Sequence, residues 1–502
     1  MRIEGFLRES ARRFPGKTAI VAGERRVTYE ALAADAARLA RTLRARGVAR
    51  GDRVVLFLDN SPEAVAAIFA VLAAGAAFSV VNPGTKLDKL AYILKNCGAR
   101  AVITEPRLQP LATEATRSAP SVGFTLSSPF DFQEDIVLEK EEAGIDLDLA
   151  MIVYTSGSTG FPKGVMMTHQ NVVAAATSIT TYLESVPEDV VLSVLPLAFD
   201  YGLYQALMCV KVGATLVLEK SFTYPAVLLE RLRGERVTGL PLVPTIAAVL
   251  LQLKDLKPGM FPALRYITNT AAALPPAHIA RLQELFPATR LYSMYGLTEC
   301  KRCTYLPPEE LARRPGSVGI AIPGTEAYVV DEHGRRVPPG RVGELVIRGA
   351  HVMKGYWADP QASERVLRPG PFPWEKVLHT GDLFRTDEDG YLYFVGRKDD
   401  IIKSRGEKVS PKEVENVLYE LAGLREAAVV GVPDPLLGMA IKAVVVKDPE
   451  SGLTARDVIR HCAARLEDFM VPRMVEFRES LPKSENGKIS RSRVLDEMRA
   501  ET

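Results

Sequence analysis

Apolar residues in the first 150 positions follow two different spacings. Leu32, Ala36, Leu39 and Leu43 recur every three or four residues, which places them on one face of a helix. Unbroken apolar runs lie between such stretches and are typical of strands buried on both faces of a parallel sheet. Helices that separate strands in this way predict an α/β fold with parallel sheets. The predicted strands cover 53–58, 77–81, 190–195, 214–218 and 265–268.

The pattern changes after about residue 325. Shorter strands at 327–330, 343–348 and 391–395 are separated by turns rich in glycine, proline and aspartate. This spacing predicts a β-rich subdomain at about 325–396, appended to the parallel sheets.

Beyond residue 400 the sequence predicts a compact α+β unit. Ser410-Pro411-Lys412-Glu413 has the form of a capping box, and Thr454 begins a second amphipathic helix. Strands are expected at 427–432 and 440–446 between these helices. The charged stretch Arg-Lys-Asp-Asp at 397–400 is the candidate hinge. We therefore predict an N-terminal domain at 1–396 and a C-terminal domain at 401–502 on either side of it.

Composition narrows the function classes. The 502 residues carry a formal net charge of +2, which gives no reason to expect nucleic acid or an anionic membrane as partner. No uncharged run approaches the roughly 20 residues of a membrane span, and the first residues lack the apolar core of a signal peptide. We therefore expect a cytoplasmic enzyme with no nucleic-acid partner and no membrane span.

The five cysteines are too few and too scattered for a disulfide framework. Cys300 and Cys303 form a CxxC, but a zinc site would need a second ligand pair nearby. They are either a redox pair or two unrelated thiols.

The segment 154–164, Tyr-Thr-Ser-Gly-Ser-Thr-Gly-Phe-Pro-Lys-Gly, follows a buried-looking strand and combines aliphatic hydroxyls, glycines and one lysine. A loop of this composition can present backbone N–H groups, hydroxyls and a cation to a polyphosphate. It is not a Walker loop, because no Gly-Lys-Ser/Thr closes it. The alternative is a surface loop between two strands.

Three further motifs carry groups suited to phosphate or sugar chemistry. The stretch 295–299, Tyr-Gly-Leu-Thr-Glu, offers a hydroxyl and a carboxylate, and oxygen ligands suit Mg²⁺. Asp382 and Arg397 could converge on a ribose diol or form an ion pair at a turn. Lys488 follows an Asn-Gly turn, where most lysines are simply solvated.

In this order and spacing, the four motifs resemble those of the adenylate-forming superfamily of acyl-CoA synthetases, peptide-synthetase adenylation domains and luciferases, over about residues 10–495. The resemblance implies that a carboxylate attacks the α-phosphorus of ATP, giving an acyl-adenylate and pyrophosphate. A thiol then releases AMP. It also implies a large N-terminal domain of two parallel-type sheets with a β-rich subdomain, and a small mobile α+β C-terminal domain that closes over AMP.

The resemblance assigns a role to residues along the whole chain. Lys488, Thr298 and Glu299 would be catalytic, with Glu299 holding Mg²⁺ and Lys488 bridging the acid and the α-phosphate. The acid would contact Phe199, Asp200, Asn269, Met294 and Gly296. Asp382 and Arg397 would hold the ribose. The other nucleotide contacts would be Thr155, Ser156, Gly157, Ser158, Thr159, Gly160, Lys163, Thr270, Ala271, Ala272 and Tyr295.

The resemblance further places a hinge at Asp399 and a thiol channel at Arg405 and Gly406. Arg405 stands where several relatives carry lysine, and Ala273 where many carry proline. Coenzyme A is the expected thiol, and a carrier protein supplied in trans is the alternative. A homodimer is compatible with the resemblance.

Asp200, in Leu-Ala-Phe-Asp-Tyr-Gly at 197–202, is the clue to the acid. Many acyl-CoA ligases carry histidine there, whereas amino-acid adenylation domains use such an aspartate for the substrate ammonium. A carboxylate beside an apolar pocket needs a cationic or donor partner. Two interpretations stay open: an amino-bearing substrate, or pairing of Asp200 with protein and a plain fatty or aryl acid. Three functions therefore remain: acyl-CoA ligase, stand-alone amino-acid adenylating enzyme loading a carrier, and non-catalytic nucleotide binder.

Overall fold

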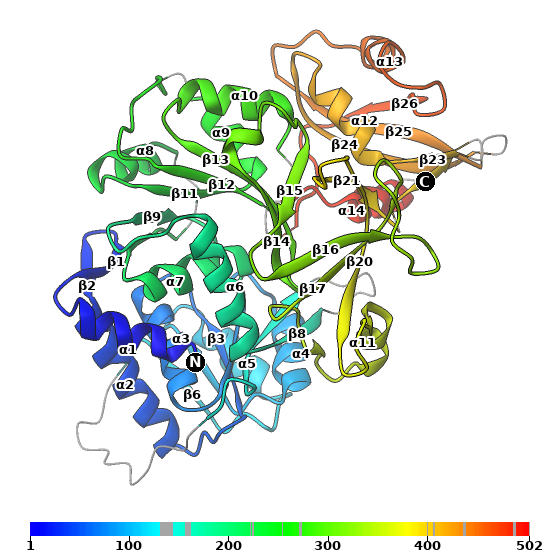
Figure 1. Cartoon of the computed structure of the whole chain (residues 1–502). Coiled ribbons are helices and arrows are strands. Elements are labelled where there is room, and N and C mark those ends of the chain that lie inside the picture. The colour runs from blue at the N-terminus through cyan, green and yellow to red at the C-terminus, as the bar shows by residue number, and fades with distance from the viewer. Residues whose placement is uncertain are drawn as a thin grey trace.

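The computed structural model describes residues 1–130, 144–155, 162–220, 222, 225–253, 255–270, 274–398, 400–404, 407–434, 438–484 and 488–500. Within these residues, two large sheets form the N-terminal part and a smaller sheet forms after residue 400. Figure 1 shows the C-terminal unit, coloured orange to red, beside the β-rich part of the N-terminal unit.

The first large sheet has a parallel centre and an antiparallel edge. Its order is β18-β8-β7-β4-β3-β5-β6, with β7 and β8 joined as an antiparallel pair. Alternate residues of β3 are buried on opposite faces, which is why the strand is apolar from Val54 to Phe57. The strands are β3 (Arg53–Phe57), β4 (Ala77–Val80), β5 (Ala101–Thr104), β6 (Phe124–Ser127), β7 (Leu149–Thr155), β8 (Lys163–Thr168) and β18 (Gly355–Tyr356).

The second large sheet begins parallel and becomes antiparallel. Its parallel strands are β1 (Thr18–Ala22), β10 (Thr215–Leu218), β9 (Val190–Ser193), β11 (Gly239–Leu242), β12 (Tyr266–Asn269) and β13 (Arg290–Leu297), with β2 (Arg25–Thr28) at the edge. The antiparallel strands are β14 (Lys301–Leu306), β15 (Ser317–Ala321), β21 (Leu392–Arg397), β20 (Lys376–Thr386), β17 (Gly343–Gly349), β16 (Thr325–Val330) and β19 (Leu367–Pro369).

Helices join the two large sheets into one core. Helices α1, α2, α3, α6 and α7 contact one another, and the largest buried cluster contains residues from them and from both sheets. The helices of the N-terminal part are α1 (Glu4–Arg13), α2 (Tyr29–Ala45), α3 (Pro62–Ala73), α4 (Leu87–Cys97), α5 (Gln109–Thr116), α6 (His169–Tyr182), α7 (Asp200–Val212), α8 (Pro225–Gly234), α9 (Pro244–Leu251), α10 (Pro276–Leu285) and α11 (Pro360–Val366), with the short 3₁₀ helix η1 (Pro308–Glu310).

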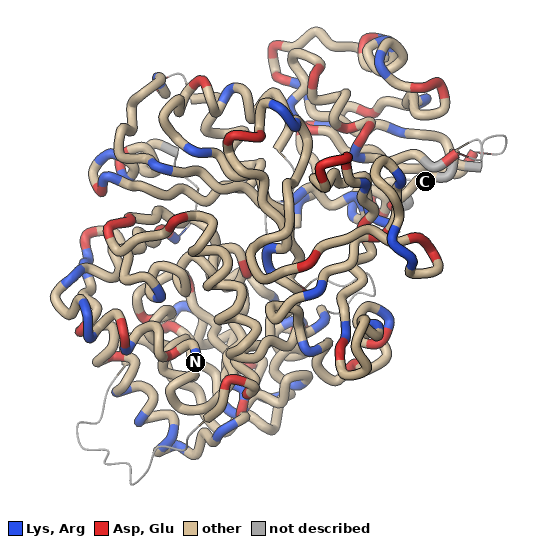
Figure 2. The backbone as a smooth tube through the Cα atoms, viewed as in Figure 1, with Lys and Arg blue, Asp and Glu red and all other residues tan. Residues whose placement is uncertain are grey.

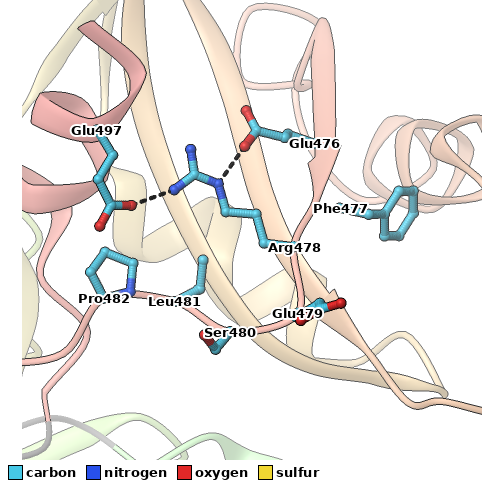
Figure 3. A pocket seen from close by; sticks show the side chains of 8 residues that line it. All are labelled: Glu476, Phe477, Arg478, Glu479, Ser480, Leu481, Pro482 and Glu497. Atoms are coloured by element: carbon cyan, nitrogen blue, oxygen red, sulfur yellow. Dashed lines mark hydrogen bonds and ion pairs between the residues drawn. The ribbon is translucent and has the colours of Figure 1, made fainter. Parts of the chain in front are cut away.

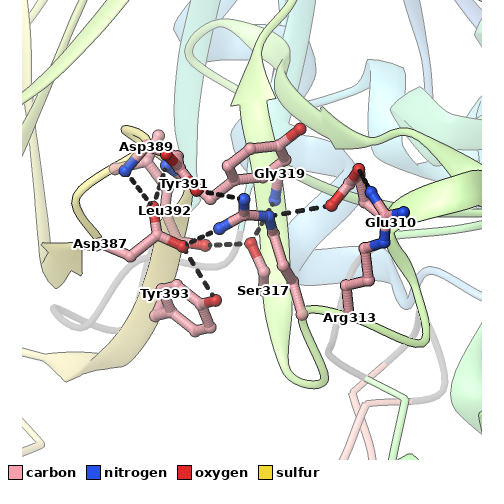
Figure 4. A network of polar contacts seen from close by, with 10 residues as sticks. Glu310, Arg313, Ser317, Gly319, Asp387, Asp389, Tyr391, Leu392 and Tyr393 are labelled. Carbon is pink, nitrogen blue, oxygen red and sulfur yellow. Dashed lines mark hydrogen bonds and ion pairs between the residues drawn. The ribbon is translucent and has the colours of Figure 1, made fainter.

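A polar network fastens the β-rich strands to the rest of the sheet (Figure 4). The guanidinium of Arg314 binds the carboxylates of Asp387 and Asp389 in the β20–β21 turn, and Glu310 accepts from its Nε at 3.0 Å. Ser317 Oγ donates to the carbonyl of Leu392 at 2.9 Å. These contacts hold β15 against β21, the pairing through which the β-rich strands continue the large sheet.

The C-terminal unit has its own small cores on the two faces of its sheet. Ser410 accepts from the N–H of Glu413 at the start of α12, and Thr454 forms a full capping box with Asp457 at α13. Arg478 joins β26 to α14 by binding Glu476 and, at 2.6 Å, Glu497 (Figure 3). Its elements are β22 (Ile402–Ser404), β23 (Glu407–Val409), α12 (Pro411–Tyr419), β24 (Leu424–Asp434), β25 (Gly438–Lys447), α13 (Ala455–Ala463), β26 (Met474–Phe477) and α14 (Arg491–Ala500).

The predicted α/β fold with a β-rich part and a small α+β unit is confirmed. The antiparallel part of the second large sheet begins at β14, before residue 325, where the sequence predicts the start of the β-rich subdomain. The reason is that β14 and β15 continue the parallel sheet rather than starting a separate one. Figure 2 shows Lys and Arg interspersed with Asp and Glu along the chain. No helix in the described ranges is long and apolar enough to cross a membrane.

Gly319 is required where β14 and β15 meet. It has a φ of +87°, and a Cβ built on it would lie 1.8 Å from the carbonyl oxygen of Tyr305. Gly324 has a φ of +76° with nothing within 4 Å of such a Cβ, so Gly324→Ala isolates the backbone strain alone. We expect Gly324→Ala to lower the free energy of unfolding by about 1 kcal/mol and Gly319→Ala to lower it by about 3 kcal/mol or more, measured by chemical denaturation. Equal losses in the two variants would contradict a steric clash between a side chain at 319 and the Tyr305 carbonyl.

Candidate functional site

The candidate site lies at the carboxyl ends of strands from both large sheets. Thr155 ends β7, Asn269 ends β12, and Thr298 and Glu299 follow β13 directly. Asp200 begins the helix α7 that comes after β9. This edge is where open α/β sheets generally bind their ligands.

The two ends of the predicted phosphate loop are fixed by the β7–β8 pair. Thr155 and Lys163, the residues at its two ends, are directly opposed in the ladder. The Lys163 ammonium lies 5.2 Å from the centre of the Tyr356 ring. Cation and ring attract one another in this arrangement, which directs the lysine toward the neighbouring acidic motif.

Tyr356 connects the phosphate loop to Glu299. Its hydroxyl donates to Glu299 Oε1 at 2.7 Å, and the N–H of Met353 donates to the Glu299 carbonyl at 2.8 Å. Burial raises the pKa of Tyr356, and the charge of Glu299 raises it further, so the phenol stays a donor. Lys163 therefore lies over the ring of Tyr356 while Glu299 binds its hydroxyl, so one tyrosine contacts both residues.

Asp382 and Arg397 form a cross-strand ion pair with a buried carboxylate and an exposed guanidinium. They are opposed in the β20–β21 ladder, and Arg397 Nε donates to Asp382 Oδ1 at 3.0 Å. The carboxylate is only 4% exposed and also accepts from the Tyr295 hydroxyl at 2.6 Å. Burial raises the pKa of Asp382, and the charge of Arg397 opposes that rise. Tyr295, expected at the adenine, thus also positions the Asp382 carboxylate.

Lys488 stands on a segment tied closely to the C-terminal sheet. The N–H of Ser484 donates to the Lys488 carbonyl at 2.7 Å, and the N–H of Lys488 donates to Ser484 Oγ at 3.2 Å. Lys483 Nζ binds Glu426 Oε1 at 2.6 Å. Arg491, just beyond, binds Glu415 at 2.7 Å and Asp400 at 3.0 Å, which fixes the start of α14. The backbone of Lys488 is therefore held in place.

The Lys488 side chain reaches the N-terminal site. Burial lowers its pKa, and the carboxylates of Asp200, Asp382 and Glu299 act on its charge in the opposite direction. These three residues belong to α7, β20 and the turn after β13, so one ammonium joins elements far apart in the sequence. Within the described residues, the last motif therefore lies close enough to Glu299 and Asp382 for their charges to act on Lys488.

The residues expected around the acid gather on α7, β12 and β13. Asp200 occupies the first turn of α7, where the helix dipole favours a carboxylate, and Phe199 is its N-cap residue. Asn269 is fully buried, and Met294 Sδ accepts from the Tyr182 hydroxyl at 2.9 Å. At Gly296 a Cβ would lie 1.7 Å from the Lys301 carbonyl oxygen, which explains the glycine.

Sequence reasoning missed Lys301 and Arg302, which are 3% and 4% exposed. The only local signal for them is a pair of adjacent cations inside the CxxC, one residue after the acidic motif. Cys300 and Cys303 are free and fully buried, with their sulfurs 2.9 Å apart. Burial raises the pKa of Cys300 well above its usual value.

Some expected site residues lie outside the described residues. They are Ser156, Gly157, Ser158, Thr159 and Gly160 of the phosphate loop, Ala271 and Ala272 of the adenine segment, Asp399 of the hinge, and Arg405 and Gly406 of the thiol channel. Their flanking residues Thr155, Lys163 and Thr270 are described, and Thr270 is buried.

Comparison with known proteins agrees with this geometry. The AMP-binding enzyme family matches residues 7–357, and the AMP-binding enzyme C-terminal domain matches residues 413–488. A long-chain-fatty-acid–CoA ligase of Bacillus subtilis (strain 168) is 32% identical, with 99% of this chain and 94% of the relative covered. A feruloyl-CoA synthase of Amycolatopsis sp is 34% identical, with 96% of each covered. The ATP-bound crystal structure of MatB from Rhodopseudomonas palustris has a TM-score of 0.88 at 29% identity, with 99% of each chain covered.

The family match covers most of the chain, and the relatives align along nearly all of it. The chain therefore belongs to the AMP-binding enzyme family, within the adenylate-forming superfamily that its four motifs indicate.

Proposed function

We propose that this protein is an acyl-CoA ligase, which activates a carboxylic acid with ATP and transfers the acyl group to coenzyme A. The observation that carries the proposal is the Lys488 ammonium, which the C-terminal unit presents to the carboxylates of Asp200, Asp382 and Glu299. A partly buried cation at that position is suited to two anions that must meet: an organic carboxylate and the α-phosphate of ATP.

The nucleotide would lie across both large sheets. Thr155 and Lys163, with the loop between them, would bind the β- and γ-phosphates. Asp382 would accept from the ribose hydroxyls, and Arg397 would keep that carboxylate charged. Thr270 and the segment 293–295 would bound the adenine.

Glu299 suits Mg²⁺ as one carboxylate ligand among phosphate oxygens, which is how proteins usually bind this ion. Tyr356 occupies Oε1 of that carboxylate and fixes its orientation. When bound, Mg²⁺ would neutralise charge on the polyphosphate.

In the first step, a carboxylate oxygen of the acid forms a bond to the α-phosphorus while the bond to pyrophosphate breaks. Negative charge grows on the equatorial oxygens, and the fixed ammonium of Lys488 stabilises it more than it stabilises the separated reactants. In the second step, the thiol sulfur bonds to the acyl carbon, AMP leaves, and the thiol proton is released.

The domain boundaries 1–396, 397–400 and 401–502 belong to this proposal. Lys488 must leave the site after adenylation so that the thiol can approach, and a rotation about Asp399 would withdraw it. Arg405 and Gly406 would then line the thiol channel. A hinge of this kind needs only a few residues that change φ and ψ.

The relatives named as CoA ligases support coenzyme A over a carrier protein. For Asp200, the neighbouring charges support pairing with protein, because its carboxylate acts to raise the pKa of both Lys488 and Lys301. We therefore propose that Asp200 keeps these lysines charged and does not bind a substrate ammonium.

Removing the Lys488 ammonium should abolish most adenylation. We expect Lys488→Ala to lower ATP–pyrophosphate exchange by roughly 10²–10³-fold or more, the cost of a lost donor at a developing charge. Arg460→Ala removes an exposed cation from the same unit and should leave exchange unchanged. Full-rate exchange in Lys488→Ala would contradict the proposal.

The pH dependence of activity should show a lysine whose pKa lies below its ordinary value. Because burial lowers the pKa of Lys488, its cation is present below that pKa and is lost as pH rises through it. The alkaline fall of kcat/KM, which reports the free enzyme, should therefore begin below the ordinary lysine value of about 10.4. Lys488→Arg keeps its charge and should move the fall upward in whatever activity remains. An unmoved alkaline limb would assign the titration to another group.

The acceptor can be tested directly. With ATP and an acid that supports exchange, free coenzyme A should yield acyl-CoA, detected by mass spectrometry. Holo-carrier proteins tested in parallel should remain unloaded. Loading of a carrier without turnover of coenzyme A would replace the ligase with the carrier-loading alternative.

A further inference from the structure

Three buried hydrogen-bond donors beside the site have no acceptor in the described part of the chain. They are Lys301 Nζ, Arg302 Nε and the Tyr204 hydroxyl, on side chains that are 3%, 4% and 1% exposed. We call these three residues the donor cluster. Buried polar groups are almost always paired, so an unpaired group calls for a partner that the protein itself lacks.

The backbone is shaped to direct both cations at α7. Lys301 has a φ of +62°, an uncommon conformation for a residue with a side chain. The β13–β14 ladder shifts register between Tyr295, which pairs with Thr304, and Gly296, which pairs with Arg302. As a result, Lys301 Nζ lies 5.7 Å from the centre of the Tyr204 ring, and Arg302 Cζ lies 4.7 Å from that of Tyr201, both on α7.

The donor cluster adjoins the reacting centre but is distinct from it. The charges of Asp200 and Glu299 act on Lys301, and the same two carboxylates act on Lys488. The charge of Arg302 acts on the phenols of Tyr182, Tyr201 and Tyr204. The cluster therefore extends from the catalytic lysine into the region between α6, α7 and β14, where the acid is expected.

The charges of this region do not balance. In the described chain, Asp200 and Glu299 are the carboxylates that act most on Lys301. The same two carboxylates also act on Lys488, and Arg302 adds a further buried cation beside Lys301. An uncompensated buried charge is costly, and one further anion would neutralise it.

We propose that the donor cluster binds a second carboxylate of the substrate, so that the acid activated is a dicarboxylic acid. Lys301 and Arg302 supply the charge, and the Tyr204 hydroxyl supplies a third donor. The inference rests on the proposed ligase function and names its substrate class. If the cations instead only balance Asp200 and Glu299, their loss should affect all acids alike.

The test compares acids that differ only in the end group. Pyrophosphate release is measured with ATP and coenzyme A for succinate against butyrate, adipate against hexanoate, sebacate against decanoate, and terephthalate against benzoate. 4-Aminobutyrate replaces the second carboxylate by an ammonium. We expect the preferred acid to be a dicarboxylate, favoured over its monocarboxylate counterpart by roughly 10- to 100-fold in kcat/KM, the effect of a charged hydrogen bond.

Lys301→Met and Arg302→Met should each remove most of this preference, chiefly by raising KM for the dicarboxylate, and leave the monocarboxylate nearly unchanged. Tyr204→Phe, which keeps the ring, should cause a smaller loss in the same direction. Arg290→Met removes an exposed cation from β13 and should change neither acid. Thermal unfolding checks that each variant is folded. If a Met variant is unfolded, the proposal is decided by the dicarboxylate preference of the wild type and by the loss of that preference in Tyr204→Phe.

The two proposals fail in different ways. A wild-type preference for monocarboxylates or for 4-aminobutyrate, or equal losses on both acids of a pair, would overturn the dicarboxylate inference and leave the ligase function standing. Absence of pyrophosphate release with every acid tested would overturn the ligase function itself.

Discussion

The structure depends on one partly buried ammonium that belongs to a different unit from the carboxylates that act on it. Lys488 is carried by the C-terminal unit, whereas Asp200, Asp382 and Glu299 belong to the N-terminal part. Burial of a lysine is unfavourable by itself, and nearby carboxylates only partly offset that cost. The docked position is therefore conditional on charge. In the proposed function, bound phosphates and an organic carboxylate would strengthen it, and their conversion would weaken it, which suits the proposed withdrawal of the C-terminal unit.

The remainder of the fold serves to place these charges. The β13–β14 turn is central, because it carries Glu299, which accepts from the Tyr356 hydroxyl, and, two residues later, Lys301, which lies over the Tyr204 ring of α7. Gly296 is needed because the returning strand leaves no room for a side chain. Tyr356 and Tyr295 add phenolic hydrogen bonds to Glu299 and Asp382. The parallel sheets give a rigid edge, and the antiparallel strands extend it to the C-terminal unit.

Much of this could be predicted from the sequence, for identifiable reasons. The apolar face of α2 and the buried strands β3 and β4 have clear spacing, and glycine, hydroxyl and lysine patterns mark the phosphate loop. Contacts between distant segments could not be predicted from local patterns. The Asp382–Arg397 pair could equally have been a surface turn until the β20–β21 register opposed the two residues. The buried cations Lys301 and Arg302 carry no periodic signal, and only a positive φ and a register shift direct them inward.

The most direct measurement is a crystal structure of the chain with a non-hydrolysable ATP analogue and Mg²⁺. The account predicts the Lys488 ammonium within about 2.7–3.1 Å of an α-phosphate oxygen, with Glu299 at the metal and Asp382 at the ribose. A nucleotide bound elsewhere, or Lys488 in solvent while the analogue fills the site, would contradict it.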